Sequence, residues 1–146
     1  MDPKELLDAL DDARIVEAIR RAEDRSRGEI RVHVTSDAEG DPKGAAAEAF
    51  ARLGMTATAE RNGILIYVSP RAQTFAIVGD EGVHRLCGEA FWRDVAAALE
   101  YEFRERRFTE GILRGIERAG DLLARHFPRL EGKSDRDELP NAVSRD

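Results

Sequence analysis

The chain contains a single cysteine, Cys87, among its 146 residues, so it cannot form an internal disulfide. No apolar run approaches the roughly 18 residues of a membrane-spanning helix, and the amino terminus lacks the basic start and apolar centre of a secretion signal. Basic residues are outnumbered: 23 Lys and Arg against 29 Asp and Glu give a net charge of −6, which disfavours phosphate backbones and anionic lipids as partners. These absences predict a cytoplasmic protein that is not membrane-inserted and binds no nucleic acid.

Length and composition predict one compact domain. With 42% hydrophobic residues, the chain can build one core of its own and is too short for two ordinary domains. We place this domain at residues 1–128, because Pro128 stops the last predicted helix. Residues 129–146 are charged and have few apolar anchors, which predicts a flexible or loosely docked C-terminal tail.

The first half of the chain alternates between helical and strand patterns. Apolar residues recur at helical spacing from Ile15 to Ala22, and again from Ala46 to Leu53 after the helix-starting pair Asp41-Pro42. Between these helices, residues 30–34 alternate apolar and polar side chains, as in a strand with one apolar and one more polar face. A second strand follows the second helix, and strands joined through a helix favour parallel pairing.

The second strand is expected at Ile64 to Val68, where every position is apolar, so it should be covered on both faces. Residues 69–73 are few enough for a hairpin into a third strand at Thr74 to Val78, which predicts antiparallel pairing. The fold class is therefore α/β: a small mixed β-sheet of three to four strands, built as β-α-β and then a hairpin, sandwiched between helices.

Two amphipathic helices are predicted after Gly82. Apolar residues mark one helix from Phe91 to Phe103 and another from Ile112 to Leu123. Thr109 fits the N-cap of the second helix, with Phe108 before it as a hydrophobic staple.

The predicted strand directions bring polar residues together at one end of the sheet. Parallel first and second strands begin where the antiparallel third strand ends. Glu29 opens the first strand, Arg61 and Asn62 open the second, and Asp80 closes the third. The last turn of the first helix leads to the same place. The resulting candidates are Glu23, Glu29 and Asp80 as metal ligands for Ca²⁺ or Mg²⁺, and Arg61, Asn62 and Trp92 as ligand-binding residues.

The same residues fit a simpler interpretation. Ca²⁺ takes about 6 to 8 oxygens, so backbone carbonyls and water would have to complete this set. Carboxylates near Arg61 can instead form a surface ion-pair cluster, and the glycines can serve backbone geometry alone. His84 and Cys87 are close enough in sequence for a nucleophile pair, although a buried inert thiol is the commoner case. The sequence identifies no catalytic residue.

Several segments resemble the signature of the TPM domain family, from about residue 8 to residue 128. They include Gly28-Glu29-Ile30-Arg31-Val32-His33-Val34, Leu53-Gly54-Met55, Arg61-Asn62-Gly63-Ile64-Leu65-Ile66-Tyr67-Val68, Ala76-Ile77-Val78-Gly79-Asp80-Glu81-Gly82, Phe91-Trp92, Phe108-Thr109-Glu110-Gly111 and His126-Phe127-Pro128. In the tail, Asp137-Glu138-Leu139-Pro140 is similar to an Asn-Glu-Leu-Pro segment of the soluble bacterial branch, which has neither signal peptide nor membrane anchor. The resemblance implies the sheet-and-helix fold predicted above.

Roles assigned within the TPM family are acid phosphatase activity in chloroplasts, calcium binding in some bacterial members, and assistance to membrane protein complexes. Many relatives carry Asp-Asn-Gly where this chain has Arg61-Asn62-Gly63, which exchanges a candidate cation ligand for a cation. A guanidinium suits a carboxylate or phosphate ligand instead. Three functions are therefore open: a binding or assembly module for a partner protein or a divalent cation, a metal-assisted phosphomonoester hydrolase, and a purely structural domain.

Overall fold

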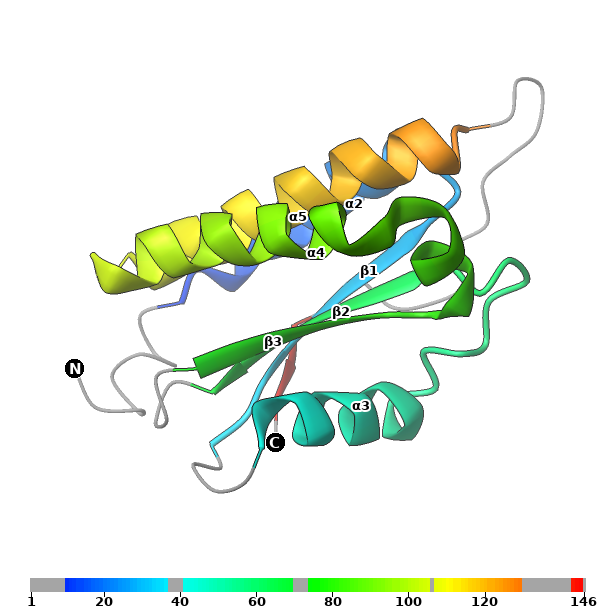
Figure 1. Cartoon of the computed structure of the whole chain (residues 1–146). Helices are drawn as coiled ribbons and strands as arrows, with labels where there is room; N and C mark the ends of the chain where they lie inside the picture. Colours follow the sequence, from blue (N-terminus) through cyan, green and yellow to red (C-terminus); the bar gives the residue numbers. More distant parts are fainter. Residues whose placement is uncertain (1–9, 37–40, 70–73, 106, 130–142, 146) are drawn as a thin grey trace.

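The computed structural model describes residues 10–36, 41–69, 74–105, 107–129 and 143–145. The elements in chain order are α2 (Asp12–Asp24), β1 (Glu29–Val34), α3 (Pro42–Arg52), β2 (Gly63–Ser69), β3 (Thr74–Gly79), α4 (Glu81–Arg104), α5 (Phe108–His126) and β4 (Ser144–Arg145). The strands form one sheet in the order β3-β2-β1-β4. Helices α2, α4 and α5 cover one face of the sheet and α3 covers the other, which confirms the predicted fold class (Figure 1).

Strand pairing follows the predicted directions. β1 and β2 are parallel, with Glu29 opposite Gly63, and β2 and β3 are antiparallel, with Ile64 opposite Gly79. The helix α3 joins the two parallel strands, because a parallel pair cannot be closed by a tight turn. Residues 70–73 of the predicted hairpin lie outside the described residues.

The central strand β2 is buried on both faces, as its continuous apolar run predicts. Ile64, Ile66 and Val68 belong to the core beneath α2, α4 and α5. Leu65 and Tyr67 belong to a second core beneath α3. Since fully burying a large apolar side chain stabilises the fold by about 1.5 to 3 kcal/mol, β2 is the strand that holds the two helical layers together.

Aspartate side chains cap the N-termini of α2 and α3. The Asp11 carboxylate accepts a hydrogen bond from the Arg14 amide at 3.2 Å and caps α2. The Asp41 carboxylate caps α3 in the same way, and Pro42 occupies the first turn, where its missing N–H removes no hydrogen bond. Such caps stabilise a helix by about 1 kcal/mol each.

The predicted N-cap at Thr109 is wrong. Helix α5 begins at Phe108, and Arg107 stands at its N-cap position without a side-chain cap. The Thr109 hydroxyl instead accepts a hydrogen bond from the Asp11 amide at 3.3 Å. Phe108 packs edge-on against Phe103 at 5.2 Å between ring centroids, so a tertiary contact with α4 sets where α5 begins.

The C-terminal residues that the structure describes join the sheet. Ser144 and Arg145 pair in parallel with His33 and Val34 at the outer edge of β1. Most of the predicted tail, residues 130–142, lies outside the described residues. Among the helices of the described part, none is long and apolar enough to cross a membrane.

Candidate functional site

The candidate site is the end of the sheet where β1 and β2 begin and β3 ends, which we call the rim. Glu29 pairs with Gly63 across the parallel strands. The Asp80 amide donates to the Gly63 carbonyl at 2.9 Å across the antiparallel strands. Glu29, Gly63 and Asp80 therefore lie in one row across the sheet. The backbones at Glu29 and Asp80 are two strand spacings apart in this row, or about 10 Å.

The strongest contact at the rim joins Arg61 and Asp80. The Arg61 Nε donates to Asp80 Oδ2 at 2.7 Å and Nη2 donates to Oδ1 at 2.9 Å, a bidentate pair. The Asp80 side chain is 5% exposed, whereas that of Arg61 is 46% exposed. Hydrogen bonding to the Asp80 carboxylate, together with its charge, raises the pKa of Arg61 above its ordinary value. The pair thus holds a permanent positive charge at the surface on a buried anchor.

The backbone around this pair is closely constrained. Arg61 has a φ of 51°, in the left-handed region that non-glycine residues rarely adopt. Its carbonyl accepts a hydrogen bond from the Gly82 amide at 2.9 Å. A Cβ at Gly82 would lie 2.3 Å from the Glu60 carbonyl oxygen, so only glycine permits this approach. Asp80 also caps α4, because its Oδ1 accepts from the Glu81 amide at 2.7 Å.

Asn62 lies beneath the rim and is 1% exposed. Its side-chain Nδ2 donates to the Arg27 carbonyl at 2.9 Å, and its amide donates to the Thr58 hydroxyl at 3.2 Å. Its carbonyl accepts from the Glu29 amide, which ties β2 to β1. No described residue donates to the side-chain Oδ1 of Asn62, so this buried oxygen can accept a bond from a ligand.

Trp92 stands at the same end of the molecule, on α4. A Cβ at Gly79 would lie 2.1 Å from the Trp92 ring, so the indole covers the last residue of β3 directly. The ring also packs against His84 and Phe91, at 4.8 and 4.4 Å between centroids. The indole Nε1 is buried and has no hydrogen-bond acceptor among the described residues. Trp92 therefore contacts the end of β3 rather than the Arg61–Asp80 pair itself.

The buried acids Glu23 and Glu29 complete the predicted set. Glu23 is 3% exposed, and its Oε2 accepts from the Ile30 amide at 2.9 Å, which joins the end of α2 to β1. Glu29 is 1% exposed. Within the described ranges, no three His, Cys, Asp or Glu side chains converge as a metal-binding group. A Ca²⁺ or Mg²⁺ site at Glu23, Glu29 and Asp80 stays a prediction.

The sequence analysis missed a second ion pair at the rim. Arg27 donates to both Glu60 oxygens, from Nε at 2.8 Å and from Nη2 at 3.0 Å. Its amide donates to the Phe127 carbonyl at 2.7 Å, and its Nη1 donates to the Pro128 carbonyl. The bond from Arg27 holds the pKa of Glu60 below its ordinary range. The parallel register could have indicated this pair. Because Glu29 lies opposite Gly63, residue 27 is expected opposite residue 61, and Glu60 is the neighbour of residue 61.

The Cys87 and His84 side chains do not look like a nucleophile and its base. His84 packs its ring against Trp92. Burial raises the pKa of the Cys87 thiol, which lowers the share of the reactive thiolate at neutral pH. The inert-thiol interpretation therefore has the better physical support.

Comparison with known sequences supports the family resemblance. Residues 1–122 match the profile of the TPM domain. No curated protein matches the chain.

Solved structures match over most of the chain. The BA42 protein from the psychrophilic bacterium Bizionia argentinensis is 39% identical, with a TM-score of 0.87, and the match covers 94% of this chain and 96% of that protein. Two N-terminal domains share the fold at lower identity. One, from a P. gingivalis protein, is 17% identical with a TM-score of 0.65 over 84% of this chain and 83% of that one. The other, from cg2496 of Corynebacterium glutamicum, is 18% identical with a TM-score of 0.61 over 75% and 68%.

Proposed function

The chain belongs to the TPM domain family, and we propose that it is a non-catalytic binding or assembly module. Its rim engages an acidic group, a carboxylate or a phosphate, on a ligand or partner protein. One observation carries the proposal: the half-exposed guanidinium of Arg61 is fixed bidentately by the buried carboxylate of Asp80. A guanidinium fork is the side-chain group best matched to such an acid.

The anchoring of Arg61 favours binding because less side-chain entropy remains to be lost. A free arginine must be ordered when it binds, at a cost of roughly 0.5 to 1.5 kcal/mol. Arg61 is already ordered by Asp80, and its remaining N–H groups are available to a second acceptor. The unusual left-handed backbone at Arg61 fits a functional constraint of this kind.

The same contacts argue against hydrolysis at this position. Asp80 Oδ2 accepts from Arg61, and Oδ1 accepts from both Arg61 and the Glu81 amide. Both oxygens of this carboxylate are thus occupied by donors within the protein, which leaves it badly placed to contact a substrate as base or nucleophile. The proposal therefore assigns Asp80 the role of a positioning residue for Arg61.

An NMR titration tests the proposal. Labelled protein is titrated with inorganic phosphate and with a glutamate-containing peptide, and a peptide with glutamine in place of glutamate serves as the neutral probe. We expect the Arg61 Nε–H and the Asn62 amide to shift with the acidic probes and not with the neutral one. Arg61→Gln should abolish these shifts.

The matched control is Arg85→Gln, which removes another exposed arginine with an acidic partner, Glu81. It should leave the shifts at the rim unchanged. Shifts that spread over many exposed arginines, or that persist in Arg61→Gln, would overturn the proposal and leave the purely structural role. A phosphomonoester assay on the same variants, with and without divalent ions, tests the hydrolase alternative. This alternative is ruled out if turnover is absent or does not depend on Arg61.

A divalent cation is a second candidate ligand, favoured by the buried Oδ1 of Asn62. Carbonyl and carboxylate oxygens are what Ca²⁺ and Mg²⁺ take, and Glu29 lies in the neighbouring row. Millimolar CaCl₂ should then raise the melting temperature of the protein, and Asn62→Ala should reduce the shift. No change in melting temperature with CaCl₂ or MgCl₂ would remove this candidate while leaving the Arg61 titration to stand on its own.

A further inference from the structure

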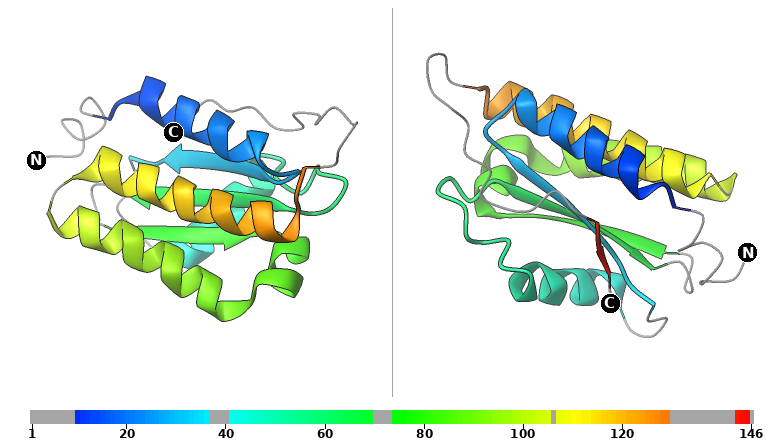
Figure 2. Two further views of the ribbon diagram at one scale, coloured as in Figure 1. Left: turned by 90° about the horizontal axis from the view of Figure 1, so that it is seen from above. Right: turned by 180° about the vertical axis from the view of Figure 1, so that it is seen from behind.

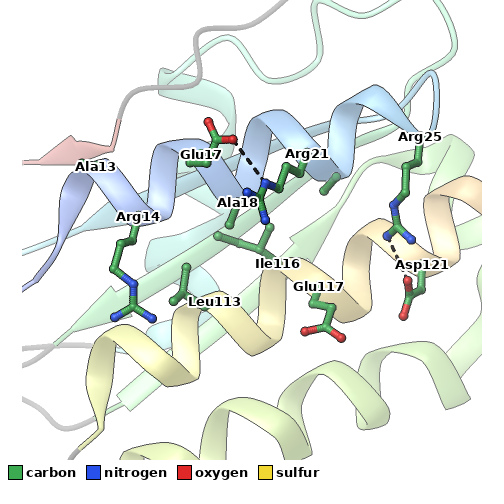
Figure 3. A pocket seen from close by; sticks show the side chains of 11 residues that line it. Ala13, Arg14, Glu17, Ala18, Arg21, Arg25, Leu113, Ile116, Glu117 and Asp121 are labelled. Carbon is green, nitrogen blue, oxygen red and sulfur yellow. Dashed lines mark hydrogen bonds and ion pairs between the residues drawn. The ribbon is translucent and has the colours of Figure 1, made fainter.

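A groove runs between α2 and α5 on the outer side of the helical layer (Figure 3). It has a volume of about 780 Å³ and is open to solvent. Its floor is made of small and aliphatic side chains, among them Ala13, Ala18 and Leu113. Alanines at the floor let another surface approach the helix backbones closely.

Helices α2 and α5 run parallel, side by side (Figure 2). Two ion pairs fix their register: Arg14 with Glu110 at 2.8 Å, and Arg25 with Asp121 at 2.9 Å. Both pairs join residues 96 positions apart in sequence. A residue of α2 therefore stands level with the residue of α5 whose number is larger by 96.

The two walls of the groove carry opposite charge. The α2 wall is net positive, because it supplies three arginines, Arg14, Arg21 and Arg25, and one acid, Glu17. The α5 wall supplies the acids Glu117 and Asp121, with Glu110 just beyond them. Each arginine stands level with one of these acids under the constant register. Glu117 has no ion-pair partner among the described residues, and Arg21, whose side chain is 77% exposed, pairs only with Glu17 on its own helix.

We propose that this groove is a self-association surface whose occupant is a second copy of the chain. A two-fold axis parallel to the groove lays α2 of one copy over α5 of the other. The position of every residue along the helix direction is unchanged by this rotation. Arg21 then faces Glu117 of the second copy, Arg25 faces Asp121, and Arg14 faces Glu110. Because the arrangement is symmetric, every such contact occurs twice.

The charge pattern selects this arrangement. A two-fold axis across the groove would lay α2 over α2 and α5 over α5, so that the net positive walls of the two copies meet and the acidic walls, with Glu117 and Asp121, meet as well. A protein partner with one sign of charge would meet one attractive wall and one repulsive wall. A second copy in the first orientation satisfies both walls at once, which is the self-complementarity that a two-fold interface requires.

The size of the surface predicts a weak dimer. The 13 residues of α2 span about 20 Å, and two adjacent helices are about 20 Å wide, so each copy presents a smaller face than the roughly 800 Å² of a standard interface. Its exposed charges are screened by salt. Association should therefore depend on both protein concentration and ionic strength.

Sedimentation measurements of the full chain test the proposal, from about 10 µM to about 1 mM protein and at about 0.05 and 1 M NaCl. The monomer mass is 16.3 kDa. We expect a monomer–dimer equilibrium at low salt that shifts towards monomer at high salt. Arg21→Glu and Glu117→Arg should each weaken association by about tenfold or more, and the double variant R21E/E117R should restore it, because the opposite charges face each other again.

The charge-swap design separates association from folding. Both positions are on the outer surface, and the double variant carries both substitutions yet is expected to regain the dimer. Arg85→Glu, a charge reversal outside the groove, serves as the matched control and should leave association unchanged. Monomer at every concentration and salt, or a double variant no better than the single ones, would overturn the proposal. Neither result bears on acid binding at Arg61, which is measured separately.

Discussion

At the residue scale, the rim is defined by two arginines, each held in place by an acidic side chain. Arg61 is held by Asp80, and Arg27 is held by Glu60 and by two backbone carbonyls of the C-terminal side of α5. Each arginine is therefore both a structural link and a surface charge. The surface charge does not depend on pH, because arginine stays protonated. The structural link does depend on pH, because its acidic partner can be protonated.

Glu60 gives a pH-dependent test of this link. Its pKa is lowered from 4.5 by Arg27 in the folded protein, so its contribution is present above that ordinary value and is lost as pH falls through the lower folded-state pKa. Glu60→Gln should lower the free energy of unfolding near pH 7 by less than about 1 kcal/mol, because the half-exposed pair is screened by solvent. In urea titrations the difference from wild type should shrink progressively below pH 4.5.

The control for this measurement is Glu89→Gln, which removes an acid whose pair with Arg93 is almost fully exposed. It should change stability by a few tenths of a kcal/mol at most. A Glu60→Gln effect that grew on acidification would contradict the assigned sign.

At the element scale, α4 contains a break that the helical spacing of its apolar residues does not predict. It spans Glu81–Arg104 but is broken at Gly88, where φ is 71° and ψ is −178°. This break separates a short segment beginning at the Asp80 cap from the long amphipathic segment that carries Trp92. The first segment can therefore follow the rim while the second lies along α5.

Gly88→Ala is expected to destabilise the fold by about 1 to 3 kcal/mol, measured by urea unfolding. Open space surrounds the position, with no described atom within 4 Å of an added Cβ, so the cost is backbone strain alone. Gly44→Ala is the matched control. That glycine lies in α3 with ordinary backbone angles, and an added Cβ would meet Asp41 at 3.5 Å, so its stability should be unchanged or raised by up to about 1 kcal/mol. Equal losses in both variants would refute a special role for the break.

At the scale of the whole molecule, the last described residues close the sheet against the first helix. The Ser144 hydroxyl is 2.8 Å from the Nδ1 of the buried His33, whose ring stacks on Tyr67 at 5.5 Å. Arg145 pairs with Asp12 at 2.6 Å, at the start of α2. Within the part of the chain that the structure describes, two residue pairs join β4 to β1, so β4 covers the end of β1 at His33 and Val34.

Deletion of residues 143–146 should lower the melting temperature and accelerate amide hydrogen exchange at the end of β1 that pairs with β4, around His33 and Val34. Ser144→Ala is the milder variant and should cost about 1 kcal/mol, since it removes one side-chain hydrogen bond and keeps the strand. Exchange in β3, at the opposite edge, is the internal reference and should not change. Unaltered exchange in β1 after the deletion would show that β4 does not protect the sheet.

The amino-acid sequence by itself determined the order and type of the main elements. The alternation in residues 30–34 indicates one polar face of β1, but tertiary packing buries most of that face as well, and Glu29 and His33 are each 1% exposed. The continuous apolar run at Ile64 to Val68 indicates that β2 is buried on both faces, and the helix between β1 and β2 indicates that these strands are parallel. Those directions were enough to place Arg61, Asn62 and Asp80 together at the rim. These features depend on neighbouring residues or on the segments that connect the strands, so the spacing of residues in the sequence is enough to predict them.

Tertiary structure decided which groups bond to which. Arg61 occupies both oxygens of Asp80, the Glu23 carboxylate turns to the Ile30 amide, and the Thr109 hydroxyl serves Asp11 rather than its own helix. The pairing of Ser144 with His33 belongs to the same class. Each depends on two segments far apart in sequence meeting at hydrogen-bond distance, where a shift of about 1 Å changes the partner, and no local spacing encodes positions that finely.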